Sequence, residues 1–148
     1  DADQKYLNIE KNPQNLIPLV MECAAGIRNK LEVFGNDYST IDGTGVRDYI
    51  HVSDLAKGHL DSIDYLFKED KNLIINLGTG NGFSVLEVVN ATEKISNKSI
   101  DYSISSRREG DPDTVIASAK KAEKLINWLP KKSDLENIIS STWEMYNK

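Results

Sequence analysis

The sequence holds one cysteine, no long apolar run and no run rich in lysine or arginine. A single cysteine excludes an internal disulfide and a cysteine-based metal framework. Cys23 lies among small apolar residues, so we expect it to be a buried hydrophobe on a helix. No apolar stretch approaches the length of a membrane span and no secretory signal opens the sequence. We therefore expect a cytoplasmic protein without a membrane partner.

Negatively charged side chains outnumber positively charged ones, 23 to 18. The 148 residues carry a formal net charge of −5, which argues against nucleic acid and anionic membrane surfaces as partners. A phosphate-bearing ligand would have to be held by a few placed arginines against this overall field. The hydrophobic share of 39% and the charged share of 28% are those of a globular chain, and the length is that of one domain.

Several binding and catalytic motifs are nearly present but incomplete. The glycine run 78–82, followed by Asp101, approaches the dinucleotide-binding fingerprint. Phe83 stands where the third glycine is needed, and its benzyl group would prevent the close approach of helix and strand. We therefore interpret the run as a structural turn before a capped helix. Ser84 lacks the closing glycine of a nucleophile elbow, because Leu86 occupies that position.

Other reaction chemistries find no support in the sequence. No Walker A sequence occurs, and His51 and His59 form no metal-ligand pattern with the single cysteine. No tyrosine is followed by a lysine four residues later, so a proton relay of that spacing is absent. We assign neither a metal site nor a catalytic residue to this chain.

Hydrophobic periodicity and turn residues predict a mixed α/β fold without internal repeats. The first twelve residues are polar and are expected to form a loop. Asn15, Ser84, Ser118 and either Ser133 or Asp134 are suited to cap helices. The predicted helices are 16–28, 53–67, 85–95, 119–128 and 135–146, and the predicted strands are 31–34, 46–52, 73–77, 99–104 and 114–117. The strand 73–77 is apolar nearly throughout, which predicts a buried strand.

Two loops carry the arginines of the chain's best candidate site. Arg47 follows the glycine turn 43–45 and shares a strand face with Tyr49, while Arg107 and Arg108 precede Asp111. Converging guanidinium groups would neutralise a diphosphate, and a carboxylate can accept hydrogen bonds from both hydroxyls of a ribose. Phe34 stands before a glycine turn, where it could pack against a base. The alternatives are a solvated charged surface and a structural ion pair of Arg47 with Asp48 or another carboxylate.

The order and spacing of these segments resemble a known family. From about residue 12 to residue 143 the chain is similar to the C-terminal portion of the UDP-glucose 4-epimerase family, within the extended short-chain dehydrogenases/reductases. The run 42–52 is the most specific part, since related sugar-nucleotide enzymes usually keep only its Arg-Asp-Tyr/Phe-x-His-Val core. The matching runs are 15–18, 33–38, 40–52, 54–56, 58–59, 76–80 and 107–111.

The resemblance implies a UDP-sugar site. Positions matching Asn15, Arg47 and Arg108 hold the diphosphate in the family, and Leu16 belongs to the same substrate-binding set. The strand matching Glu32 to Phe34 lies along the uracil, the aspartate matching Asp111 holds the ribose, and Tyr49 lines the same cleft. Val115 matches a position at which a tyrosine excludes N-acetylated sugars, so a valine there implies tolerance of UDP-N-acetylglucosamine. The alternative is that Val115 is a core residue of a strand.

The departures from the family concern what the chain lacks. Family members are more than twice as long, and their first half carries the NAD loop, the catalytic tyrosine and lysine, and a helper serine or threonine. We therefore expect residues 1–148 to be a single C-terminal UDP-sugar-binding region without the Rossmann half, unable to bind NAD or turn over substrate alone. The helix over 53–67 should expose part of its apolar face, which in the family packs on the missing half. The parent is expected to be a homodimer.

The implied parent activity is interconversion of UDP-glucose and UDP-galactose in galactose metabolism. In the family, bound NAD takes hydride from sugar C4, the 4-keto sugar turns over and hydride returns to its other face. The first alternative is another NAD-dependent nucleotide-sugar enzyme: a UDP-N-acetylglucosamine 4-epimerase, a UDP-glucuronate decarboxylase or a dTDP-glucose dehydratase. The second is a non-catalytic module that binds nucleotide sugars.

Overall fold

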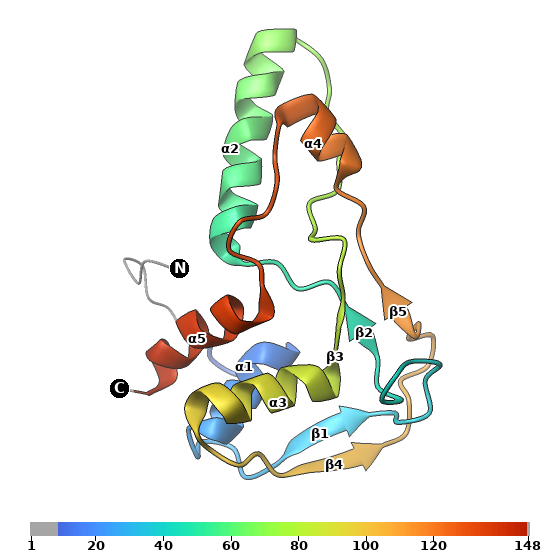
Figure 1. The fold of residues 1–148 in the computed structure, drawn as a ribbon, viewed down its shortest axis with the longest axis vertical. Coiled ribbons are helices and arrows are strands. Elements are labelled where there is room, and N and C mark those ends of the chain that lie inside the picture. The colour runs from blue at the N-terminus through green and yellow to red at the C-terminus, as the bar shows by residue number, and fades with distance from the viewer. Residues whose placement is uncertain (1–8, 148) are drawn as a thin grey trace.

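The structure, a computed structural model, describes residues 9–147 and has the expected mixed α/β fold (Figure 1). One part, which we call the core layer, contains three helices and a parallel pair of strands with the register Leu31↔Tyr102. These elements are α1 (Leu16–Ala24), β1 (Leu31–Phe34), α3 (Val85–Ser96), β4 (Tyr102–Ser105) and α5 (Leu135–Tyr146). The main hydrophobic cluster lies between them and includes Val20, Met21, Leu31, Val33, Val88, Val89, Ile139 and Trp143.

Side-chain caps fix where two of these helices begin. The backbone N–H of Glu87 donates to Ser84 Oγ at 3.0 Å, and the backbone N–H of Ser84 donates to Glu87 Oε2 at 2.7 Å. This reciprocal capping box satisfies two backbone donors that the first turn leaves without an intrahelical partner. At α5 the N–H of Asn137 donates to Asp134 Oδ1 at 2.8 Å. The predicted cap Ser84 is therefore confirmed, and of the two candidates Ser133 and Asp134 it is Asp134 that caps α5.

A small second sheet joins three distant loops. Its order is β3 (Phe83–Ser84), β2 (Val46–Arg47), β5 (Thr114–Val115), with β2 antiparallel to β3 and parallel to β5. Gly43, in the turn that leads into β2, has a φ of +77°, and an added Cβ would overlap the carbonyl oxygen of Asn36. Only glycine fits this turn without strain. The predicted glycine turn, strand and following helix are present, but the strand covers only Val46–Arg47 of the predicted 46–52, and the helix begins at Val52.

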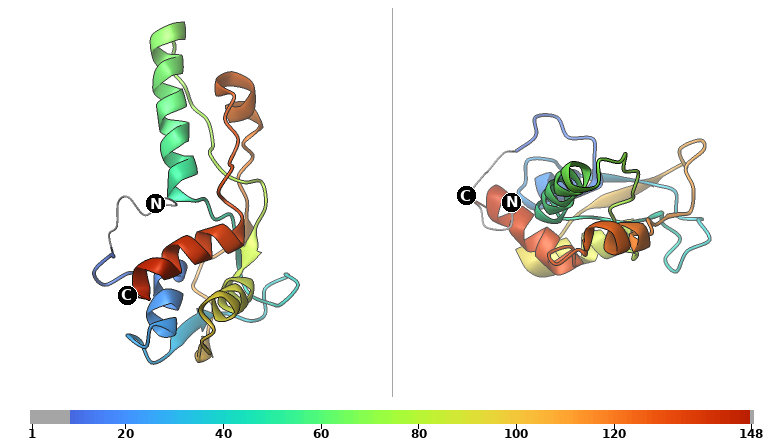
Figure 2. Two further views of the ribbon diagram at one scale, coloured as in Figure 1. Left: turned by 60° about the vertical axis from the view of Figure 1, so that its left-hand side comes forward. Right: turned by 90° about the horizontal axis from the view of Figure 1, so that it is seen from above.

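The other part, which we call the helical arm, extends away from the core layer (Figures 1 and 2). It consists of α2 (Val52–Glu69), the extended segment 71–82 and α4 (Lys120–Ile126). Its base is tied down by Asp54, which is buried and accepts hydrogen bonds from the N–H groups of Lys131 and Lys132 and from Ser133 Oγ at 2.6–3.0 Å. The indole N–H of Trp128 donates to the carbonyl of Asp54 at 2.9 Å.

The arm leaves large apolar side chains in solvent. Phe67 on α2 is 87% exposed, Leu60 on the same helix is 60% exposed, and Ile74 in the extended segment is 83% exposed. The prediction that this helix exposes part of its apolar face is therefore confirmed. Within residues 9–147, no helix is long and apolar enough to cross a membrane.

Several predicted elements are wrong or shifted. Residues 73–77 form no strand and are not buried, because no strand in the described part of the chain pairs with them. Helix α1 ends at Ala24 rather than 28, just before Gly26 with its φ of +72°. Helix α4 has Ala119, not Ser118, at its N-cap position, without a side-chain cap, and it ends at Ile126 because Asn127 is left-handed.

Three further expectations meet the structure in different ways. Cys23 is half-buried and packs against the core rather than lying fully inside it. Of the expected N-terminal loop, residues 1–8 lie outside the described residues, and residues 9–12 belong to no helix or strand. Asn15 takes the N-cap position of α1, but its side chain makes no capping hydrogen bond.

Candidate functional site

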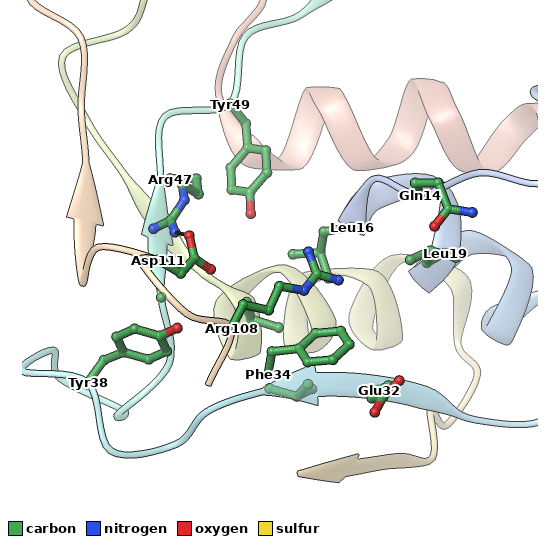
Figure 3. A pocket seen from close by; sticks show the side chains of 13 residues that line it. Gln14, Leu16, Leu19, Glu32, Phe34, Tyr38, Arg47, Tyr49, Arg108 and Asp111 are labelled. Atoms are coloured by element: carbon green, nitrogen blue, oxygen red, sulfur yellow. Dashed lines mark hydrogen bonds and ion pairs between the residues drawn. The ribbon is translucent and has the colours of Figure 1, made fainter. Parts of the chain in front are cut away.

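A pocket lies where the start of α1, strand β1, strand β2 and the loop before β5 meet (Figure 3). Segments far apart in the sequence therefore contribute to one cavity, and seven of the nine substrate-binding residues predicted from the sequence line it. These seven are Leu16, Glu32, Phe34, Arg47, Tyr49, Arg108 and Asp111. The remaining lining residues are Gln14, Leu19, Val33, Tyr38, Gly45 and Val85.

The two predicted substrate-binding residues that do not line this pocket are Asn15 and Val115.

The charged end of the pocket is built on an ion pair. Arg47 Nη2 lies 2.5 Å from Asp111 Oδ1. Arg47 Nη1 donates to the backbone carbonyl of Val46 at 2.8 Å. The alternative that Arg47 pairs with a carboxylate is therefore confirmed, with Asp111 rather than Asp48 as the partner. Because both groups are partly exposed in the pocket, the pair presents a guanidinium and a carboxylate side by side to a ligand.

The second arginine lies over an aromatic ring. The guanidinium carbon of Arg108 is 3.9 Å from the centroid of Phe34, so the two planar groups form a cation–π contact. The N–H groups of arginine lie in the plane of the guanidinium, and stacking leaves them available to bind an anion. Figure 3 shows Arg108 reaching across the pocket from the loop that also carries Asp111.

The rest of the wall is mixed in character. Glu32 accepts a hydrogen bond from Ser105 Oγ at 2.5 Å across the β1–β4 pair. Burial raises the pKa of Tyr49 to about 12, against the opposing charge of Arg47, so its hydroxyl stays protonated and able to donate. Leu16 and Leu19 supply an apolar surface from α1.

Three predicted residues lie elsewhere. Asn15 is exposed and does not line the pocket. Val115 is 48% exposed on β5, opposite Arg47 in the register, so the alternative that it is a core residue is wrong. Arg107 does not line the pocket, because its Nε lies 2.6 Å from Asp37 Oδ1 and its guanidinium stacks on Tyr38. The hydrogen bond from Arg107 lowers the pKa of Asp37.

Apart from Val33, which belongs to the strand predicted to lie along the uracil, the sequence prediction missed five lining residues. A signal existed for Leu19, which lies three residues after Leu16 and so on the same helix face. Tyr38 belongs to a run that carried the family resemblance, but nothing local shows that it is buried. The five are Gln14, Leu19, Tyr38, Gly45 and Val85.

The glycine turn 78–82 binds an anion that belongs to this chain. The Asp48 carboxylate accepts hydrogen bonds from the N–H groups of Thr79, Gly80 and Ala117 and from Thr79 Oγ1, at 2.6–3.2 Å. These amides are thus already satisfied, which agrees with interpreting the run as a structural turn. The described residues contain no group of three or more metal-ligating side chains.

Comparison with known proteins gives consistent matches. A UDP-glucose 4-epimerase of Streptococcus mutans is 42% identical over 133 residues, which cover 90% of this chain and 40% of that protein. The crystal structure of UDP-glucose 4-epimerase from Bifidobacterium longum in complex with NAD+ and UDP is 42% identical with a TM-score of 0.84, covering 93% of this chain and 41% of that one. The UDP-Glc/GlcNAc 4-epimerase from Campylobacter jejuni is 42% identical with a TM-score of 0.81, covering 99% and 43%.

The fold and the pocket together define part of an extended short-chain dehydrogenase/reductase, as the sequence predicted. The family model described as GDP-mannose 4,6 dehydratase matches residues 5–142, and the chain belongs to that family. It spans about 40% of the length of the curated relatives it matches.

Proposed function

We propose that the pocket binds the uridine diphosphate part of a nucleotide sugar. The observation that carries this proposal is the convergence of Arg47, Arg108, Asp111 and Phe34 from three separate segments on one cavity. Two guanidinium groups suit a diphosphate, a carboxylate suits a ribose diol, and an aromatic ring suits a base. The similar Bifidobacterium longum structure, a complex with UDP, supports this assignment.

Each chemical group of the ligand then has its own residues. Arg47 and Arg108 bind the diphosphate, and Asp111 accepts hydrogen bonds from the ribose. Strand β1, with Glu32 and Phe34, lies along the uracil. Asn15, Leu16 and Tyr49 complete the set that the family resemblance proposes, with Asn15 acting from the start of α1.

For the whole protein we propose UDP-glucose 4-epimerase activity with NAD, in which this chain supplies the substrate site and no catalytic residue. The glycine turn does not fit a dinucleotide, because Asp48 occupies its amides and Phe83 follows where a glycine is needed. NAD is therefore assigned to a part of the protein outside this chain. The alternatives remain another nucleotide-sugar enzyme of the family and a non-catalytic binding module, and a substrate panel on the full-length protein distinguishes them.

The exposed face of α2 fits the same proposal. Phe67 and Leu60 lie in solvent, although the helical spacing of the apolar residues on α2 is typical of a helix face that packs against another surface. We propose that this face packs against the nucleotide-binding half of the protein. The chain alone is then inactive, and measurable conversion of UDP-galactose by the pure chain would contradict this. The cytoplasmic compartment and the homodimeric parent stay predictions.

Val115 supports a broader sugar specificity. It is smaller than a tyrosine and lies opposite Arg47 in the sheet, beside the proposed diphosphate site. The 42% identical Campylobacter jejuni protein is a UDP-Glc/GlcNAc 4-epimerase. We therefore propose that the parent enzyme accepts UDP-N-acetylglucosamine as well as UDP-glucose. Val115→Tyr in the full-length enzyme should reduce turnover of the N-acetylated substrate selectively, and equal loss of both substrates would refute the proposal.

Calorimetric titration of the chain with UDP tests the binding proposal directly. Arg108→Ala should weaken binding by about ten- to a hundredfold, the effect of losing one charge-assisted phosphate contact. Arg28→Ala is the matched control, since Arg28 pairs with Glu22 and does not line the pocket. Absence of UDP binding to the unchanged chain would show that this chain does not carry the site by itself. Equal weakening by both substitutions would refute the role of Arg108.

A further inference from the structure

The hydroxyl of Tyr38 is buried without a partner. Tyr38 is only 4% exposed, and its Oη is the one buried side-chain oxygen or nitrogen in residues 9–147 that makes no hydrogen bond. Burying a hydroxyl without a hydrogen bond costs free energy, so folded proteins rarely leave one in that state. Since Tyr38 also lines the pocket, the missing partner can be a bound molecule rather than a protein group.

The surroundings hold the ring in one place. The Arg107 guanidinium carbon lies 3.9 Å from the ring centroid. On another side the backbone of Gly35 approaches so closely that an added Cβ would lie 2.6 Å from Tyr38 Cε2. The backbone N–H of Tyr38 donates to the carbonyl of Gly43 at 2.9 Å, which fixes the loop itself. The hydroxyl is therefore held in a fixed direction before any ligand arrives.

That direction is toward the charged end of the pocket. Figure 3 shows the hydroxyl of Tyr38 pointing to the side where Arg108 and Asp111 lie. Asp111 Oδ1 already accepts from Arg47 at 2.5 Å. A phenol hydroxyl donates hydrogen bonds to oxygen acceptors, and the ribose and diphosphate of a nucleotide are rich in them.

We propose that Tyr38 is a further ligand-binding residue, whose hydroxyl donates a hydrogen bond to a ribose or diphosphate oxygen of the bound nucleotide. This inference rests on the proposed UDP site and adds to it a residue that the arginine and aspartate pattern does not contain. It also gives Arg107 a function outside the pocket, as the group that positions the Tyr38 ring.

Tyr38→Phe is the decisive variant, because it removes one oxygen and keeps the ring and its contact with Arg107. In calorimetric titration with UDP we expect its affinity to fall about three- to tenfold, the effect of one neutral hydrogen bond. Tyr102→Phe is the matched control, since Tyr102 is exposed on β4 and does not line the pocket, and its affinity should not change.

The outcomes separate this inference from the one on which it rests. Failure of the unchanged chain to bind UDP shows that this chain does not carry the UDP site by itself, and it overturns both proposals for this chain. Binding by the unchanged chain and by Tyr38→Phe with equal affinity refutes only the role of Tyr38. In that case the hydroxyl is an unsatisfied buried group, and its removal should raise the urea midpoint of unfolding without changing the affinity for UDP.

Discussion

Helices α1 and α2 both show helical apolar periodicity in the sequence, yet their apolar side chains lie in different environments in the structure. On α1, Val20 and Met21 are fully buried in the core layer, while on α2 Leu60 and Phe67 lie largely in solvent. A periodic pattern therefore specifies that a helix face is to be covered, but it does not specify what covers it. The core layer covers its own faces, whereas the cover that we propose for the helical arm lies outside this chain.

The two parts are also held together by different forces. The core layer is filled with aliphatic and aromatic side chains, and burial of each contributes about 1.5–3 kcal/mol. The arm is attached through polar contacts at its base, chiefly the buried carboxylate of Asp54 and the indole of Trp128. Most of the pocket residues belong to the core layer or to the loops that lead from it. The geometry of the site is therefore set mainly by the core layer.

The largest expected effect is a difference between two truncations to alanine. Ile139→Ala removes a fully buried side chain from α5 and should lower the free energy of unfolding by about 2–5 kcal/mol. Phe67→Ala removes a larger side chain from the exposed face of α2 and should change it by less than about 0.5 kcal/mol. Urea denaturation of the chain measures both. Equal losses would show that the arm buries Phe67 in solution and would break the comparison.

A middle-sized effect is expected at the base of the arm. Asp54→Ala leaves Ser133 and two backbone N–H groups without their acceptor, which should cost about 1–3 kcal/mol. Hydrogen exchange should show faster opening of amides in α2 than in the unchanged chain, with α3 nearly unaffected. Asp64→Ala, at an exposed position on the same helix, is the control. Equal acceleration in α3 would mean that the arm and the core layer unfold as one unit.

The smallest expected effect concerns pH. His51 Nδ1 accepts the N–H of Ser53 at 3.0 Å and so caps α2 in its neutral form. Burial lowers the pKa of His51, with Asp54 acting in the opposite direction. The folded histidine binds a proton less readily than the unfolded one, so its stabilisation is present above about pH 6.5 and is lost as the pH falls below that value.

His51→Asn keeps a capping side chain without a titrating ring. The pH dependence of unfolding between about pH 7.5 and 5.5 should therefore be shallower in this variant. Because protonation of Nδ1 removes the acceptor of the cap, we expect a difference of about 1 kcal/mol. An identical pH profile for the two proteins would show that His51 does not couple α2 to pH.

Local patterns in the sequence were sufficient to predict structure that depends on contacts between residues close in the sequence. The capping box at Ser84 and the cap at Asp134 involve residues three apart; Ser84 was predicted correctly, and Asp134 was one of two candidates. The neighbours Arg107 and Arg108 show the limit of such signals. Adjacent residues on an extended stretch point to opposite sides, and only the packing of the loop decides that Arg108 enters the pocket while Arg107 stacks on Tyr38.

The failures arise from tertiary context. The apolar run 73–77 has the composition of a buried strand, but burial needs a neighbouring strand or helix, and the described residues supply too little cover. Tyr38 was not predicted as a site residue because its burial depends on Gly35 and Arg107, which the chain brings to it only after folding.

The carboxylate of Asp48 has a consequence for the order in which the chain assembles. It is bonded to Thr79, 31 residues away, and to Ala117, 69 residues away, so its hydrogen bonds close two long loops. Loop closure costs entropy before such contacts are gained, and distant contacts tend to form late in folding. Interactions made after the folding transition state slow unfolding rather than speed folding. Asp48 is thus expected to govern how long the folded site persists rather than how fast it forms.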